Sequence, residues 1–297
     1  MVAGGLAAGF PPLVYGDTAL LSEALFSPCA LGMAWLLLRA RRARRALALV
    51  LAAGVLAGLG WLTRSAGVVL LVPLALGAWR VAPRGRRGPV WAAAALVAAL
   101  VVVSPWIARD LAAFGRFVPV STQGGWTLAG TYNAVADGPG RYRAATRLPP
   151  AVPALRPIVT APLDEAEMDA RLGAAARRYA LDHPGYVLTV IGLNASRLWG
   201  SQRWLTRLSH AEMGVPPRYD GVLVAAGIAA ALLGAVGAAL LVIRRRGGPL
   251  WPWLVPVLLW LSTVVVSGAP RYRLALDPFV LMLAAVPLVA IAAAVRR

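Results

Sequence analysis

The sequence predicts an all-α integral membrane protein with about seven transmembrane helices. A partial helix precedes them, and an extracytoplasmic loop carries amphipathic or interfacial helices. Of the 297 residues, 59% are hydrophobic and only 14% are charged, whereas soluble domains are about a quarter charged. Several apolar stretches approach the roughly 20 residues that a helix needs to cross a bilayer. Clusters of arginine separate these stretches, as expected of a multi-pass membrane protein.

The first apolar segment, residues 2–10, is too short to span a bilayer and lacks a basic start, so it is typical of the end of a helix whose beginning is missing. The second and third spans form a tight hairpin with Thr63-Arg64-Ser65 at its tip, and the third span is short. The seven predicted spans are residues 17–38, 46–62, 66–79, 89–107, 221–243, 250–267 and 274–295.

The arginines predict which side of the membrane each loop faces. All 30 basic residues are arginine, and runs of them occupy the loops 39–45, 80–88 and 244–248 and the tail 296–297. The positive-inside rule places these segments in the cytoplasm. The Arg64 turn, the loop 108–220 and the turn at Pro270 then lie outside the plasma membrane. A net charge of +18 would suggest nucleic acid in a soluble protein, but this placement favours membrane topology and no nucleic-acid partner.

The chain divides into three parts: N-terminal membrane helices (residues 1–108), an extracytoplasmic loop (109–217) and a C-terminal three-helix membrane part (218–297). Within the loop, residues 162–183 predict a helix, because acids gather at their start and arginines at their end, which complements the helix dipole. Residues 185–199 predict an interfacial or re-entrant helix. The Pro-Ala stretch 149–162 is interpreted as a surface linker.

Two acids near the membrane are candidates for chemistry. Glu23 lies about six residues inside the first predicted span, where an ionisable group is costly and suggests function. We therefore take Glu23 as a candidate catalytic carboxylate. The alternative is that it pairs with an arginine or serine of a neighbouring span only to fix packing. Asp17 lies at the outer boundary and is an acceptor candidate, although a solvated or capping carboxylate explains it equally well.

Four arginines lie at the outer ends of spans, where positive charge is least expected. Because a guanidinium binds phosphate through a planar fork of donors, several of them in one outer pocket would hold a lipid phosphate at headgroup depth. We expect their side chains to converge on a cavity that Glu23 also reaches. The alternative is unrelated arginines that contact bulk headgroups. The four are Arg64, Arg109, Arg271 and Arg273.

The segment 114–133 combines a β-like run with glycines, an aromatic residue and amides. Gln123, Trp126 and Asn133 provide groups that suit a sugar, whereas an ordinary loop packed on the bilayer surface is the alternative. One cysteine and two histidines give no metal-ligand spacing, so neither a metal nor another cofactor is predicted.

The order and spacing of several short motifs resemble the family 39-type polytopic glycosyltransferases of the GT-C group. This group includes the protein O-mannosyltransferases and the lipid A aminoarabinose transferase. The motifs are Pro12 with Leu21-Ser22-Glu23-Ala24-Leu25-Phe26, Gly58-Leu59-Gly60-Trp61-Leu62-Thr63-Arg64, Pro105-Trp106 with Arg109, Phe114-Gly115 through Ser121-Thr122 and Gly125 to Asn133, and Arg271-Tyr272-Arg273-Leu274 with Pro278.

The resemblance implies a transferase that moves a sugar from a polyprenyl-phosphate donor to an acceptor hydroxyl on the outer face. On this reading the four outer arginines stabilise the departing phosphate, and Tyr272 adds a hydroxyl donor. Glu23 stands where the family often has an acid lining the cavity.

The chain also departs from the family pattern. The family's main catalytic acid lies in the first outer loop, and this chain begins after that point, so we expect a truncated form. Asp110 stands where an asparagine is more usual. The alternative function is a non-catalytic membrane protein that binds lipid phosphate or glycan. A transporter is less favoured because the halves show no matching repeats. The sugar, the acceptor and the oligomeric state do not follow from the sequence.

Overall fold

The structure is a computed structural model that describes residues 2–19, 21–83, 87–244 and 248–295. Every regular element in these residues is an α-helix or a 3₁₀ helix, which confirms the predicted all-helical class. Part of the arginine runs lies outside the described residues, namely Arg84, Arg86, Arg245, Arg246, Arg296 and Arg297.

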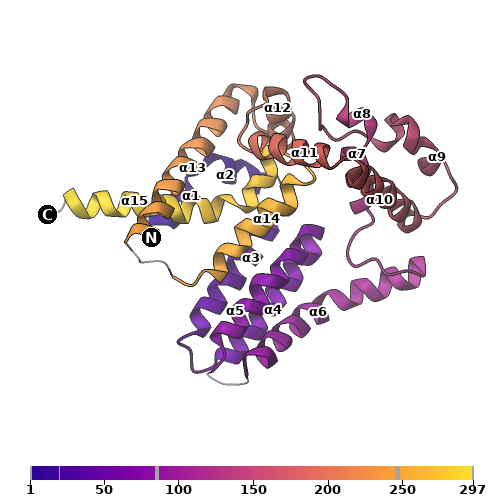
Figure 1. Cartoon of the computed structure of the whole chain (residues 1–297). Helices are drawn as coiled ribbons and strands as arrows, with labels where there is room; N and C mark the ends of the chain where they lie inside the picture. Colours follow the sequence, from indigo (N-terminus) through magenta and orange to yellow (C-terminus); the bar gives the residue numbers. More distant parts are fainter. Residues whose placement is uncertain (1, 20, 84–86, 245–247, 296–297) are drawn as a thin grey trace.

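The N-terminal part is a bundle of apolar helices (Figure 1). After α1 (Val2–Ala8) and α2 (Pro11–Thr18), it contains α3 (Ser22–Ala40), α4 (Ala46–Thr63), η1 (Ser65–Leu70), α5 (Leu71–Val81) and α6 (Arg87–Phe114). Glycine lets α4 and α6 approach closely, because a Cβ added at Gly58 would lie 2.6 Å from the carbonyl oxygen of Ala99. Small residues at such a contact are typical of membrane helix packing.

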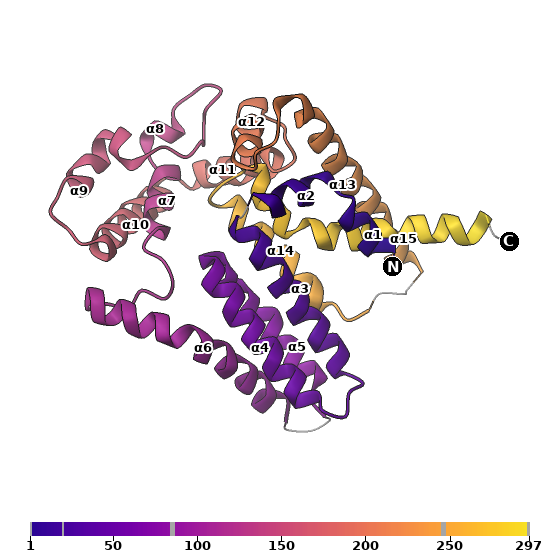
Figure 2. The same ribbon diagram turned by 180° about the vertical axis from the view of Figure 1, so that it is seen from behind.

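The middle of the chain, residues 115–216, folds into a group of helices that contacts the C-terminal part of the chain through α11 and α12 (Figure 2). We call it the loop region. After the end of α6, its main helices are α7 (Gly124–Thr131), α8 (Ala134–Asp137), α9 (Arg156–Val159), α10 (Glu165–Asp182), α11 (Pro184–Arg197) and α12 (Arg203–Glu212). A core of its own includes Leu172 and Val190, both with no exposed surface.

Helix α10 confirms the helix predicted at residues 162–183, with Asp164 as N-cap rather than Pro162 in the first turn. Two local interpretations of the loop were wrong. The segment 114–133, where a β-like run was expected, contains no strand, and its second half forms helix α7. The Pro-Ala stretch 149–162 is not a mere linker, because it makes tight helical turns that bury Val152 and Leu155 against α10 and α11. Proline favours such turns because its ring fixes φ.

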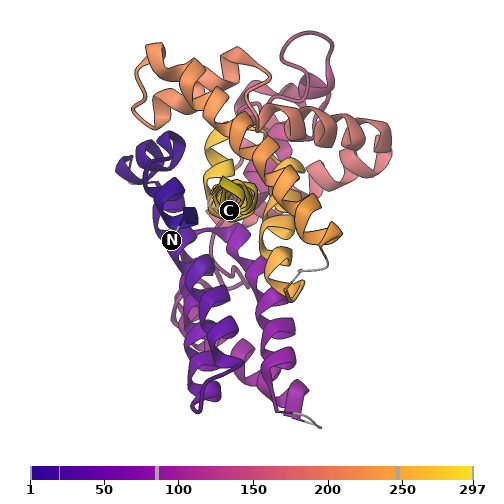
Figure 3. The ribbon, with the colours of Figure 1, turned by 90° about the vertical axis from the view of Figure 1, so that its left-hand side faces the viewer.

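The C-terminal part contains η4 (Pro217–Tyr219), α13 (Asp220–Ile243), η5 (Trp251–Trp253), α14 (Leu254–Val264), η6 (Pro270–Ala275) and α15 (Asp277–Val295). Helices α13 and α15 pack along each other, and a Cβ added at Gly237 would overlap the backbone of Leu283. In Figures 1 and 3, α15 runs across α3 and α4 rather than alongside them.

Among the described residues, five helices are long and apolar enough to cross a membrane: Ser22–Ala40, Ala46–Thr63, Arg87–Phe114, Pro217–Ile243 and Asp277–Val295. The helical segments Ser65–Val81 and Trp251–Val264 are apolar but shorter, so the predicted count of seven is not shown. The first span begins at Ser22 rather than at residue 17, since α2 is a separate helix. The last begins at Asp277, after a 3₁₀ turn. The side that each loop faces stays a prediction.

Candidate functional site

A cavity of about 730 Å³ lies where the membrane helices meet the loop region. Its wall combines the start of α3, the end of α4, the start of α7, the end of α14 and the turn η6. This volume is in the range of small-ligand sites. We call it the large cavity. Its polar lining includes five of the residues that the sequence suggested as site candidates, namely Glu23, Arg64, Gln123, Arg271 and Tyr272.

One side of the large cavity is built by a buried ion pair between α3 and α4. Glu23 lies in the first turn of α3, where the helix dipole favours a carboxylate. Helix α4 ends at Thr63, and Arg64 follows in an extended conformation that brings its guanidinium to Glu23. The Ser22 hydroxyl donates to the same carboxylate at 3.2 Å. The Glu23 side chain is only 4% exposed, so this carboxylate is almost fully shielded from water.

The adjoining side is built by Arg271 and Tyr272 of η6. The backbone N–H of Arg271 donates to the Ser209 hydroxyl of α12 at 2.9 Å, which ties η6 to the loop region. Its Nη2 donates to the Tyr272 hydroxyl at 3.0 Å, and its Nη1 lies 3.1 Å from Oε2 of Glu212. The Arg271 and Arg64 guanidinium groups lie 4.9 Å and 5.1 Å from the centroid of the Tyr272 ring, which makes two cation–π contacts.

Arg271 keeps its charge and an unused donor. Burial lowers the pKa of Arg271, but Tyr272, Glu212 and Glu23 raise it, and the net pKa lies above its ordinary value. The Nε of Arg271 is buried and has no hydrogen-bond partner among the described residues. A buried donor without a partner is costly, so the packing around Arg271 leaves one of its donors unsatisfied.

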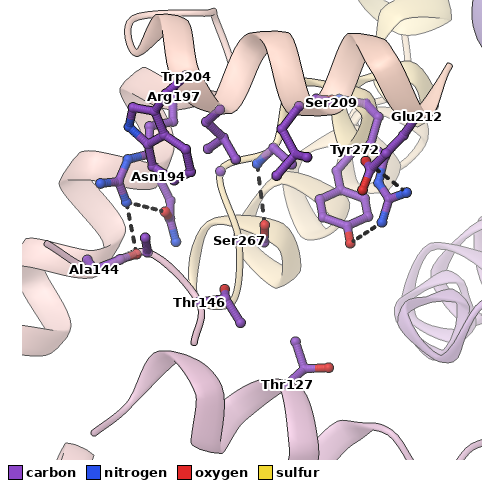
Figure 4. Close-up of a pocket in the computed structure, with 16 residues that line it drawn as sticks. Thr127, Ala144, Thr146, Asn194, Arg197, Trp204, Ser209, Glu212, Ser267 and Tyr272 are labelled. Atoms are coloured by element: carbon purple, nitrogen blue, oxygen red, sulfur yellow. Dashed lines mark hydrogen bonds and ion pairs between the residues drawn. The ribbon is translucent and has the colours of Figure 1, made fainter. Parts of the chain in front are cut away.

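A second cavity of about 210 Å³ lies next to the large one, and Thr127, Ser267, Arg271 and Tyr272 line both. We call it the small cavity. Figure 4 shows Tyr272 and Glu212 at one end of it and Asn194, Arg197 and Trp204 at the other.

Arg197 is a residue that the sequence reasoning missed, and its role is structural. It is 2% exposed, and its guanidinium donates to the carbonyl oxygens of Ala144 at 2.9 Å and Arg143 at 2.5 Å and to Oε1 of Gln202 at 2.9 Å. The bonds to Ala144 and Arg143 join the end of α11 to the loop after α8. An arginine within the apolar stretch 185–199 was the available signal, because burying such a group requires partners.

A third cavity, of about 270 Å³, lies between α7 and α10 and is lined by Gln123, Trp126, Glu165 and Asp169 among others. Gln123 also lines the large cavity. The Asp169 carboxylate accepts from the backbone N–H groups of Gly125 at 2.6 Å and Trp126 at 3.1 Å, which fixes the start of α7 on α10.

The expected convergence of four arginines was right for Arg64 and Arg271 and wrong for the other two. Arg109 has a 61% exposed side chain that pairs with Asp110 and lies over Trp106, because α6 continues through this position to Phe114. Arg273 is buried, with its Nε donating to Asp277 at 2.9 Å. In a 3₁₀ turn with three residues per turn, residues two apart point in different directions, which separates Arg273 from Arg271.

Two further candidates lie outside the three cavities. Asn133 is buried, and among the residues that the structure describes its side chain bonds only to backbone groups. Its Oδ1 accepts from the backbone N–H of Ala136 at 2.8 Å, and its Nδ2 donates to the carbonyl oxygens of Ala129 and Gly130. It is therefore the N-cap of α8 rather than a sugar ligand. Asp17 is exposed on α2 and lines none of these cavities. Within the described part of the chain, no three His, Cys, Asp or Glu side chains are grouped as metal ligands.

Comparison with known proteins supports the resemblance over part of the chain. A family model described as dolichyl-phosphate-mannose-protein mannosyltransferase matches residues 1–108, which include α3, α4, Glu23 and Arg64. No curated protein and no solved structure shows a significant match to the chain. The resemblance is thus confirmed over residues 1–108, which match a family of mannosyltransferases that use dolichyl-phosphate mannose, a polyprenyl-phosphate sugar.

Proposed function

We propose that the protein is a glycosyltransferase that moves a sugar from a polyprenyl-phosphate donor to an acceptor hydroxyl at the predicted outer face of the membrane. The observation that carries this proposal is the large cavity, where Arg64 and Arg271 approach one Tyr272 ring at the end of membrane helix α4. The family match over residues 1–108 includes one of the two arginines.

The lining of the large cavity suits an amphipathic lipid phosphate. Apolar side chains such as Leu62, Leu128 and Val266 lie in the same wall as the two arginines. In the reaction, the bond between the sugar and the phosphate oxygen breaks, and negative charge grows on the departing phosphate. Arg271 would stabilise that charge through its guanidinium, which lines the cavity. The Tyr272 hydroxyl would add a further donor.

Glu23 fits a positioning role better than the catalytic role that the sequence suggested. Its carboxylate pairs with Arg64, accepts from Ser22 and is almost fully buried, so it holds Arg64 against the Tyr272 ring. The polar groups at the start of α7, Gln123 and Thr127, lie on the same cavity and suit contacts with sugar hydroxyls. Trp126, in the neighbouring third cavity, provides an aromatic face that suits a sugar.

One observation favours the second candidate function, a non-catalytic lipid-phosphate-binding protein. Among the described residues that line the large cavity, Glu23 is the only acid, and it is already paired. Binding needs only the arginines, whereas transfer needs a base for the acceptor hydroxyl.

A transfer assay in liposomes distinguishes the two functions. The liposomes contain the purified protein, radiolabelled polyprenyl-phosphate mannose and a peptide rich in serine and threonine. We expect label to appear in the peptide. Arg271→Ala should lower this transfer about 10²–10³-fold, because it removes the charge that meets the departing phosphate. The matched control is Arg218→Ala, since Arg218 is exposed, lies over Tyr219 and lines none of the three cavities.

If the wild-type protein retains the donor but labels no peptide, the result favours a non-catalytic lipid-phosphate-binding protein. A wild-type protein that neither retains the donor nor labels the peptide would overturn both candidates.

A further inference from the structure

We propose that the small cavity receives the acceptor hydroxyl and that Glu212 accepts its proton. This inference rests on the proposed transferase function and supplies the base that the large cavity lacks. Glu212 is the last residue of α12 and was not among the candidates from the sequence.

The two cavities share a wall that would join donor and acceptor. Arg271 and Tyr272 line both, so a phosphate held in the large cavity and a hydroxyl in the small cavity would meet at these two side chains. One guanidinium spans the boundary, because Nη1 of Arg271 lies 3.1 Å from Glu212 and its Nη2 donates to the Tyr272 hydroxyl. Figure 4 shows Glu212 next to Tyr272 at this end of the small cavity.

Glu212 is also more accessible than the other acid near the shared wall. Its side chain is 39% exposed, compared with 4% for Glu23. The ion pair with Arg271 uses its Oε2, so Oε1 is the atom to which we assign proton uptake. One turn earlier on α12, the Ser209 hydroxyl accepts from the backbone N–H of Arg271 at 2.9 Å, which fixes α12 against η6.

The chemistry balances with these groups. The acceptor hydroxyl gives its proton to the Glu212 carboxylate as its oxygen bonds to the anomeric carbon of the sugar. The bond from that carbon to the phosphate oxygen breaks, and its electron pair stays on the phosphate next to Arg271. The products are a glycosylated acceptor and polyprenyl phosphate, and the proton leaves Glu212 for solvent. A positioned base typically contributes about 10²–10⁴-fold to such a step.

The test compares Glu212→Gln with the wild-type protein in the same liposomes. We expect transfer to the peptide to fall at least about 100-fold, while retention of the radiolabelled donor changes less than about threefold. The control is Glu167→Gln, because Glu167 is an acid of the loop region that pairs with Arg171 and lines none of the three cavities. This variant should match the wild-type protein in both measurements.

Chemical rescue separates a base from a residue that only positions Arg271. Formate added to Glu212→Ala should restore part of the transfer, because a small carboxylate fits the space left by the side chain, whereas chloride at the same ionic strength should not. Glu212→Asp keeps the carboxylate and should transfer faster than Glu212→Gln.

Every other outcome contradicts the assignment of Glu212 as the base, the transferase function, or both. Wild-type transfer by Glu212→Gln overturns the inference and leaves the proposed function intact. Loss of donor retention together with transfer shows that Glu212 only positions Arg271, and absence of formate rescue leads to the same conclusion. A wild-type protein that does not label the peptide overturns the transferase function and this inference with it.

Discussion

Two arginine–glutamate pairs approach the same tyrosine ring, yet they differ in burial. The Glu23–Arg64 pair joins α3 and α4, and its side chains are 4% and 17% exposed. The Glu212–Arg271 pair joins α12 to η6, and its side chains are 39% and 25% exposed. The first pair lies within the region that matches the mannosyltransferase family, and the second lies outside it.

This difference indicates different roles for similar pairs. A buried ion pair persists only while both partners are present, because a lone buried charge is costly. A more exposed pair is screened by water and contributes little to stability, so its groups can exchange partners when a substrate arrives. We therefore assign the Glu23–Arg64 pair to the scaffold and the Glu212–Arg271 pair to the chemistry.

The largest expected effect tests this assignment directly. Glu23→Ala leaves Arg64 buried without its carboxylate and should lower the free energy of unfolding by about 3–5 kcal/mol. Glu212→Ala, the matched change in the other pair, should cost less than about 1 kcal/mol. Thermal unfolding of both variants in the same detergent measures the contrast. Equal losses of stability would show that the two pairs are alike.

A smaller effect is expected at the ring that links the pairs. Tyr272→Leu removes both cation–π contacts and should destabilise the protein by about 1–2 kcal/mol. Tyr272→Phe keeps the ring and loses only the hydrogen bond from Arg271, so it should cost about 1 kcal/mol. Donor retention should follow the same order. A phenylalanine variant as unstable as the leucine variant would mean that the hydroxyl, and not the ring, connects the pairs.

The smallest effect is expected at Arg109, which resembles Arg64 in sequence position but not in environment. Its exposed pair with Asp110 predicts that Arg109→Ala changes stability by less than about 0.5 kcal/mol. Transfer and donor retention should stay at the wild-type level, in contrast to Arg271→Ala. A large loss of donor retention would place Arg109 in the donor site after all.

The comparison of Arg64 with Arg109 shows why the sequence could suggest the site but not define it. Both arginines follow an apolar span, so their local sequence signals are the same. Helix α4 ends before Arg64, whereas α6 continues past Arg109 to Phe114, and only the neighbouring α3 provides Arg64 with a carboxylate. Arg271 and Arg273 differ for a related reason, since one 3₁₀ turn directs them to different neighbours.

Glu212 shows that sequence analysis can also miss a residue of the site. It ends a polar helix in a polar loop, where acidic residues are common and do not indicate a site. Only the packing of α12 on η6 brings it to Arg271. The buried Arg197 was easier to suspect, because an arginine within an apolar stretch needs partners. Its partners nevertheless come from the loop after α8, which the sequence did not connect to α11.

The sequence by itself determined that the chain is helical and apolar, roughly where its long apolar helices lie, and which residues carry unusual charge. These properties depend on local composition, on capping and on the length needed to cross a bilayer. The tertiary structure alone decided which charges meet, which are buried and which cavities they line, because burial and pairing are set by contacts between segments far apart in the chain. That is why Glu23, Arg64, Glu212 and Arg271 form one site around Tyr272, although nearly 250 residues separate the first of them from the tyrosine.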